Sequence, residues 1–222
     1  MSYRSVTIEG PSYSGKSRFI EELALYGYAS VDENAEYANG GLEFPPLPFR
    51  TIEEAKSSVD FCLRLERLRH QAAMELASES NLPIIMDRSP LSNMVFQIML
   101  RDLESDSCSA YEYTVERILE AQKKGEIASP QVVIYLKPPS REEFLRRVNV
   151  RGETIFPIIN GYESAEFMGG WYEKVLADHF GESNSRTIVG GTPSDNAKII
   201  LDFLPNANYT EPKLDKEKLL NY

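Results

Sequence analysis

Hydrophobic residues along the chain alternate between short unbroken runs and longer stretches with the period of a helix. The short runs cover residues 5–9, 28–32, 82–87, 131–136 and 185–189. Runs that are apolar on both faces are typical of strands in a parallel sheet covered on both sides. The stretches with helical period lie between them, at about residues 16–26, 52–80, 90–103, 111–124, 140–150, 162–180 and 193–203.

This order of elements predicts the architecture. Strands and helices alternate, which favours right-handed crossovers and an α/β fold with a doubly wound, five-stranded parallel sheet flanked by helices. The chain has 222 residues, enough for one large domain, which we place at residues 1–205. The apolar period is lost after Pro205, so residues 206–222 are expected to form a C-terminal tail that either docks as a short helix or stays mobile.

Charge and composition narrow the functional classes. The chain carries 24 Lys and Arg against 34 Asp and Glu, a net charge of −10 that repels the phosphate backbone of nucleic acids. No stretch approaches the ~18 apolar residues that a membrane span needs. The only cysteines, Cys62 and Cys108, form no C-x-x-C pair. We expect a cytoplasmic protein that binds neither nucleic acid nor membrane.

The strongest chemical signal follows the first predicted strand. Residues 10–17 read Gly-Pro-Ser-Tyr-Ser-Gly-Lys-Ser, which fits G-x-x-x-x-G-K-[ST] and opens a predicted helix. In such a loop backbone N–H groups bind phosphate oxygens, Lys16 adds charge at the terminal phosphates, and the Ser17 hydroxyl can bind magnesium. We therefore predict ATP and Mg²⁺ as cofactors, with ATP contacts from Gly10, Ser12, Tyr13, Ser14, Gly15, Lys16, Ser17 and Arg18.

Charged residues also end two other predicted strands. Asp87 and Arg88 follow a buried-looking strand, at the sheet edge where α/β proteins bind ligands. Asp87 can bind magnesium or accept a substrate proton, and Arg88 can bind a phosphate; a simple pair between them is the alternative. Glu33 is a candidate general base, with capping of the next turn as its alternative. A GTPase would have a D-x-x-G switch after the strand that ends at Asp87, and an N-K-x-D motif that binds the base. This chain has no D-x-x-G at that strand end and no N-K-x-D, which argues against a GTPase.

Three segments resemble a known family. Arg67 and His70, followed by the segment from Asp87 to Gln97, resemble the R-x-x-H and D-R-Y-x-x-S-x-x-A-Y-Q segments of thymidylate kinases. The Ile8-Glu9-Gly10 start of the phosphate loop resembles thymidylate kinases and their deoxynucleoside kinase relatives. Residues 144–153 resemble the R-x-x-x-R-G lid segment of the family.

The resemblance implies a P-loop NTPase fold with a helical lid at about residues 141–160. It places Arg67 at the acceptor base, Arg88 at the acceptor phosphate, and Arg147 and Arg151 of the lid at the transferred phosphoryl group. It also implies a homodimer formed through the helices at 52–80 and 90–103.

The same resemblance places Glu33 near the general base that deoxynucleoside kinases use, and Gly191 beside the adenine ring of ATP. Gln97 joins the substrate contacts because it falls on the resembling segment. The candidate catalytic residues are Lys16, Glu33, Asp87, Arg88, Arg147 and Arg151.

These residues predict a phosphotransferase that moves the γ-phosphoryl group of ATP to a nucleoside monophosphate or a nucleoside. Two alternatives remain open at this point. The acceptor is another small hydroxyl compound, or the protein is a non-catalytic ATP-binding regulator.

Overall fold

The computed structural model describes residues 3–151 and 161–222, without the side chain of Arg151. Five parallel strands form one sheet in the order β2-β3-β1-β4-β5. Their bounds are β1 Ser5–Glu9, β2 Ser30–Val31, β3 Ile84–Asp87, β4 Val132–Leu136 and β5 Ser185–Ile188. The predicted five-stranded parallel sheet is therefore confirmed, with β2 shorter than the apolar run that predicted it.

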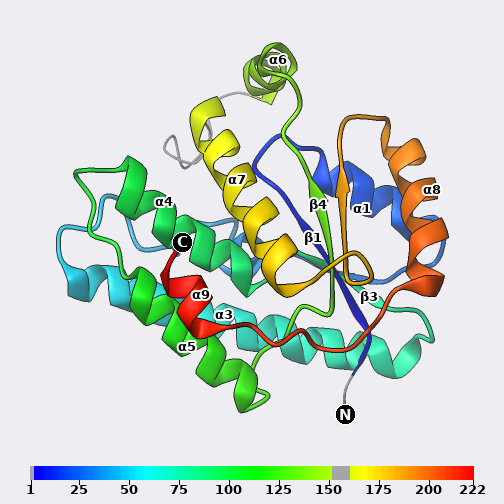
Figure 1. Cartoon of the computed structure of the whole chain (residues 1–222), viewed down its shortest axis with the longest axis horizontal. Helices are drawn as coiled ribbons and strands as arrows, with labels where there is room; N and C mark the ends of the chain where they lie inside the picture. Colours follow the sequence, from blue (N-terminus) through cyan, green and yellow to red (C-terminus); the bar gives the residue numbers. More distant parts are fainter. Residues whose placement is uncertain (1–2, 152–160) are drawn as a thin grey trace.

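Helices cover both faces of this sheet (Figure 1). On one face lie α1 (Lys16–Ala24) and α8 (Pro193–Phe203), which pack against Val6 and Ile8 of β1. On the other face lie α3 (Ile52–Glu79), α4 (Pro90–Leu103), α5 (Tyr111–Lys123) and α7 (Tyr162–His179). Because side chains alternate along a strand, Val133 and Tyr135 of β4 face this second layer while Ile134 faces the first.

Local signals in the sequence account for several helix starts. Thr51 and Glu54 form a capping box at the start of α3, with each side chain bound to the backbone of the other. Ser89 caps α4 by accepting from the Leu91 N–H, and Thr192 caps α8 in the same way. One short helix, α2 (Asn34–Tyr37), was not predicted, because four residues are too few to show a helical period.

The C-terminal tail docks on the second helical layer. After a 3₁₀ turn, Leu204–Asn206, the chain ends in α9 (Lys216–Leu220), which packs against α5. Leu219 is fully buried there, and its carbonyl oxygen accepts from the Tyr111 hydroxyl at 2.7 Å. Of the two expected states of the tail, the structure has the docked one.

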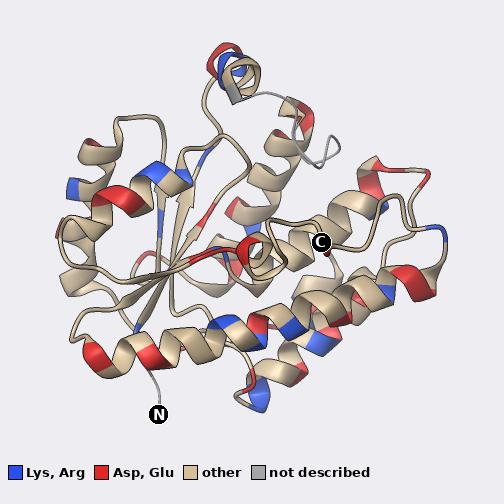
Figure 2. Cartoon of the chain, turned by 180° about the vertical axis from the view of Figure 1, so that it is seen from behind, with Lys and Arg blue, Asp and Glu red and all other residues tan. Residues whose placement is uncertain are grey.

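Charged residues of both signs are interspersed along the helices on the face shown in Figure 2. At the C-terminal end of α5, for example, Glu120 pairs with both Arg117 and Lys124. Among the described residues, no helix is long and apolar enough to cross a membrane.

Candidate functional site

The carboxyl ends of the strands meet at the phosphate loop between β1 and α1. Gly10 has φ 146°, and a Cβ there would lie 2.5 Å from the Leu136 carbonyl oxygen of β4, so only glycine fits. Gly15, at φ 101°, precedes α1 and also favours glycine. The loop thus bends sharply back over the start of α1, and its backbone lies against β4.

Lys16 lies inside this bend. Its Nζ donates to the carbonyl oxygens of Gly10 at 3.1 Å and Pro11 at 3.2 Å. Burial, assisted by the positive charge of Arg88, lowers the pKa of Lys16 to about 8. A polyphosphate would restore the charged form, because its oxygens accept hydrogen bonds and carry negative charge.

Other members of the loop fit a nucleotide and its metal. Ser14 Oγ is buried without a hydrogen-bond partner among the described residues, while Ser17 and Arg18 are exposed. Within the described part of the chain, no cluster of three or more His, Cys, Asp or Glu side chains could hold a metal by itself.

Asp87, Arg88 and Glu33 meet at the ends of β2 and β3. Arg88 Nε donates to Glu33 Oε2 at 2.7 Å, and Arg88 Nη1 donates to the Gly10 carbonyl oxygen at 3.1 Å. Arg88 therefore joins the candidate base to the phosphate loop, instead of pairing with Asp87. Glu33 precedes α2, but its side chain makes no capping hydrogen bond.

The surroundings displace the pKa values of both carboxyl groups. Burial alone would raise the pKa of Glu33, but the charges of Arg88 and Lys16 and the Arg88 hydrogen bond lower it below its usual value. Burial raises the pKa of Asp87, which Lys16 and Arg88 oppose only in part. Asp87 Oδ1 is buried and has no hydrogen-bond partner among the described residues, as expected for an oxygen that binds a cation.

A fully buried arginine of α3 holds the two strand ends together, and the sequence analysis missed it. Arg69 Nε donates to the Asp32 carbonyl oxygen at 2.8 Å, and Nη2 donates to those of Asp87 at 2.7 Å and Arg88 at 2.9 Å. Arg69 Nη1 also pairs with the buried carboxylate of Glu66 at 2.9 Å. Arg69 thus positions the backbone at the ends of both β2 and β3.

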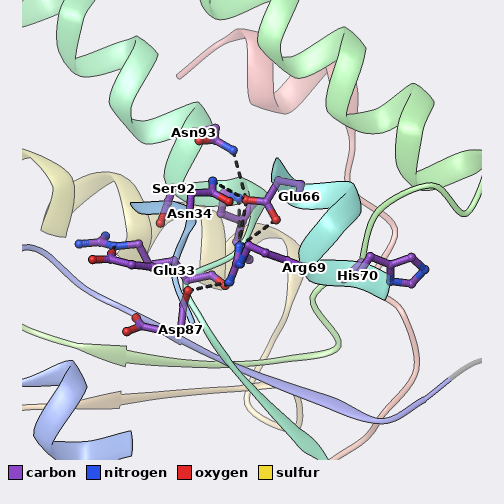
Figure 3. Close-up of polar contacts among 12 residues, drawn as sticks. Glu33, Asn34, Glu66, Arg69, His70, Asp87, Ser92 and Asn93 are labelled. Carbon is purple, nitrogen blue, oxygen red and sulfur yellow. Dashed lines mark hydrogen bonds and ion pairs between the residues drawn. The ribbon is translucent and has the colours of Figure 1, made fainter. Parts of the chain in front are cut away.

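Figure 3 shows this network of polar contacts between α3, α4 and the strand ends. Glu66 also accepts from the side-chain amides of Asn34 at 2.9 Å and Asn93 at 3.4 Å. These donors, together with Arg69, satisfy the buried oxygens of Glu66 by hydrogen bonds. The helix α3 therefore contributes a complete ion pair to the floor of the site.

Two predicted substrate contacts lie elsewhere. Arg67 pairs with Glu126 at 2.6 Å, and its side chain is 39% exposed. Gln97 is buried and accepts from the Ala110 N–H at 2.8 Å, where it joins α4 to the start of α5. The structure does not bring either residue into the cluster around Arg88, so we leave both out of the candidate site.

The predicted lid begins with α6 (Arg141–Arg151), which lies beyond the carboxyl end of β4 (Figure 1). Arg147 Nη1 donates to the Tyr13 carbonyl oxygen of the phosphate loop at 2.8 Å, and Nε pairs with Glu143 at 2.7 Å. Arg147 therefore contacts the phosphate loop. The side chain of Arg151 and residues 152–160 of the predicted lid lie outside the described residues.

Gly191 follows β5 in the loop that leads to α8. Its φ is 84°, in the left-handed region that favours glycine, and a Cβ there would displace the side chain of Asn196. The aromatic residues Trp171 and Tyr172 of α7 pack in the hydrophobic core.

No protein-family model matches the sequence. The structure is similar to deoxyadenosine kinase from M. mycoides with bound dATP, with a TM-score of 0.62 and 17% identity over 90% of this chain and 99% of that chain. It is also similar to thymidylate kinase from Candida albicans, with a TM-score of 0.62 and 12% identity over 92% of this chain and 93% of that chain.

A second structure of the M. mycoides enzyme, with the products dCMP and a flexible dCDP bound, matches with a TM-score of 0.52 and 19% identity, over 90% of this chain and 98% of that chain. Identities this low establish a common architecture without establishing a common reaction. The chain therefore has the α/β P-loop fold seen in deoxyadenosine kinase and thymidylate kinase.

Proposed function

We propose that this protein transfers the γ-phosphoryl group of magnesium-bound ATP to a hydroxyl group of a nucleoside, with Glu33 as the general base. The observation that carries the proposal is the Glu33 carboxylate, ionised and held at 2.7 Å by Arg88 next to the phosphate loop. The similar kinases support the choice of a nucleoside-like acceptor.

The donor side is built on the phosphate loop. Lys16 and Ser14 would bind phosphate oxygens of ATP, and Arg147 lies at the loop where the γ-phosphoryl group would be. Ser17 and Asp87 would hold the magnesium ion, which supplies positive charge to the phosphate oxygens when it is bound. Phosphoryl transfer depends mainly on such positioning and charge neutralisation.

The acceptor side needs a group that removes a proton. Glu33 would accept the proton of the nucleoside hydroxyl as its oxygen forms a bond to the γ-phosphorus. The bond from the γ-phosphorus to the oxygen that bridges the β- and γ-phosphates breaks, and ADP leaves. Arg88 keeps Glu33 ionised in the free protein, because its charge and hydrogen bond lower the pKa of Glu33.

A nucleoside monophosphate is the second candidate acceptor. A phosphate acceptor is already anionic and needs a cation more than a base. Arg88 is a cation next to the phosphate loop, and its guanidinium donates to Glu33 and to the Gly10 carbonyl oxygen. A nucleoside acceptor needs Glu33 as a base, whereas a monophosphate acceptor does not. A substitution of Glu33 therefore distinguishes the two acceptors.

The test is to measure ADP formation by the purified protein with Mg²⁺ and ATP against a panel of nucleosides and nucleoside monophosphates. We expect turnover with a nucleoside, and a loss of kcat of roughly 10²–10⁴-fold in Glu33→Gln with little change in the KM for ATP. Glu36→Gln is the matched control, because Glu36 is an exposed residue of α2, which begins just after Glu33.

Turnover with monophosphates alone, unaffected by Glu33→Gln, would replace the proposal with a nucleoside monophosphate kinase in which Arg88 binds the acceptor phosphate. Tight ATP binding without turnover for any acceptor would favour a non-catalytic ATP-binding protein.

A further inference from the structure

Glu9 is a fully buried carboxylate that the proposed reaction does not use. It ends β1 directly before Gly10 of the phosphate loop. Its Oε1 accepts from the Ser89 N–H at 2.8 Å and the Ser89 hydroxyl at 2.6 Å. Its Oε2 accepts from the hydroxyls of Ser92 and Tyr172, both at 2.7 Å. Both oxygens are therefore satisfied, each by a different part of the fold.

The Oε1 side fixes the backbone around Arg88. Arg88 has φ 69°, in the left-handed region that is unfavourable for a residue with a side chain. Its own N–H donates to the Ile8 carbonyl oxygen at 3.0 Å, and the next N–H, of Ser89, donates to Glu9. Consecutive backbone groups of the strained turn are thus held by consecutive residues of β1.

The Oε2 side fixes Glu9 itself. Tyr172 comes from α7, is fully buried, and stacks on Tyr135 of β4 with ring centroids 5.1 Å apart. Ser92 comes from α4 and also contacts the Tyr172 hydroxyl at 3.1 Å. Because these donors come from packed helices, the carboxylate cannot turn away from Ser89 without leaving them unpaired.

We propose that Glu9 is a positioning residue for phosphoryl transfer: through Ser89 it holds the Arg88 turn, and so keeps the guanidinium of Arg88 at Glu33 and the phosphate loop. This inference rests on the function proposed above, because it assigns a purpose to the position of Arg88. Glu9 is fully buried and bonded to protein donors, so its effect is exerted through the Arg88 turn.

Glu9→Gln tests the proposal, because an amide keeps one accepting oxygen and replaces the other with a donor, so the Ser89 groups and the Ser92 and Tyr172 hydroxyls can no longer all donate to it. We expect kcat to fall roughly 10–100-fold, as misplacement of a catalytic group does, with a much smaller change in the KM for ATP. Ser89→Ala removes the hydroxyl that donates to Oε1, and it should also lower kcat. It keeps the proposal testable if Glu9→Gln does not fold.

Tyr172→Phe is the matched control on the Oε2 side. It removes a hydrogen bond to Glu9 but leaves the contacts to Ser89, so it should lower the urea midpoint while keeping most of the turnover. If Glu9 were only a structural residue, kcat in all three variants would follow stability alone. That result would overturn the proposal.

A double-mutant cycle on urea unfolding gives a readout that needs no activity. If Glu9 holds the Arg88 turn, Glu9→Gln and Arg88→Met together should shift the midpoint by less than the sum of the single shifts. Additive shifts would overturn the hold on Arg88. If the two shifts are coupled but the protein turns over no acceptor, the proposed function is overturned, while the contact of Glu9 with the Arg88 turn stands.

Discussion

The two edges of the sheet bury polar groups in different ways. At the carboxyl edge, Lys16, Asp87 and Arg88 are charged groups whose pKa values burial and neighbouring charges displace. At the amino edge, a hollow of about 270 Å³ is lined by residues that include Tyr3, His70 and Gln131. The hollow lies at the amino edge, whereas the buried charges with displaced pKa values lie at the carboxyl edge.

At the amino edge, neutral groups satisfy one another. The side chain of Gln131 accepts from the Ser5 N–H at 3.0 Å and donates to the Tyr3 carbonyl oxygen at 3.0 Å. The Tyr3 hydroxyl lies 3.1 Å from His70 Nδ1, and burial lowers the pKa of His70, which favours the neutral imidazole. At the carboxyl edge, Asp87 Oδ1 has no hydrogen-bond partner in the described structure. Chemistry is therefore indicated by displaced and unpaired charge more than by a hollow.

The largest effect should come from removing the buried charge of the phosphate loop. Lys16→Met should lower turnover by roughly 10²–10³-fold, because the lysine would stabilise negative charge on the transferred group. Stability should be kept, since a buried charge is replaced by an apolar side chain of similar length. Steady-state kinetics and urea unfolding measure the two effects, with exposed Lys124→Met as control. Full turnover in Lys16→Met would contradict the assignment of residues 10–17 as the loop that binds the phosphates of ATP.

Two arginines of α3, Arg67 and Arg69, sharpen the same contrast in stability. Arg69→Met leaves the Glu66 carboxylate buried without its cation, and should cost about 3–5 kcal/mol of unfolding free energy. Arg67→Met removes only a partly exposed pair with Glu126, so its effect should be much smaller. Equal shifts of the urea midpoint in the two variants would contradict the role given to Arg69.

Lys16 also predicts a pH dependence of ATP binding. Its pKa is about 8 in the free protein, against an ordinary value of 10.5, so between these two pH values the folded free protein binds fewer protons than the unfolded chain. Stability without ATP should thus gain a contribution from Lys16 as pH rises through this window. A bound polyphosphate restores the proton, so affinity should fall by up to about tenfold per pH unit there.

Calorimetric titration of ATP at pH 9, in two buffers with different ionisation enthalpies, measures the proton uptake. We expect uptake in the wild-type protein and none in Lys16→Met. Equal uptake in both proteins would show that another group binds the proton.

The smallest effect is expected at the amino edge. His70→Gln changes the hollow but leaves the charged edge intact, so kcat and both KM values should stay within about twofold of wild type. Steady-state kinetics with the accepted substrate are the measurement. A tenfold loss of kcat would show that the amino edge also affects the reaction.

Much of the site follows from the sequence alone. The period of hydrophobic residues predicts the strands, and the glycines and Lys16 predict the phosphate loop, because both are local patterns. That Asp87 and Arg88 lie beside this loop follows from the parallel sheet, since parallel strands end at a common edge. Short segments of the sequence therefore predict both the architecture and the sheet edge at which the charged residues lie.

Only the tertiary structure decides which side of a long helix meets that edge. Arg67 and Arg69 are two residues apart, which is about 200° around a helix, so they lie on nearly opposite faces. The family resemblance selected Arg67, while packing of α3 against the strand ends buries Arg69.

The pair of Arg88 with Glu33, and the four contacts of Glu9, join residues 55 or more positions apart in the chain. No local pattern encodes such contacts. They arise when burial leaves each charged group only the partners that the fold brings to it.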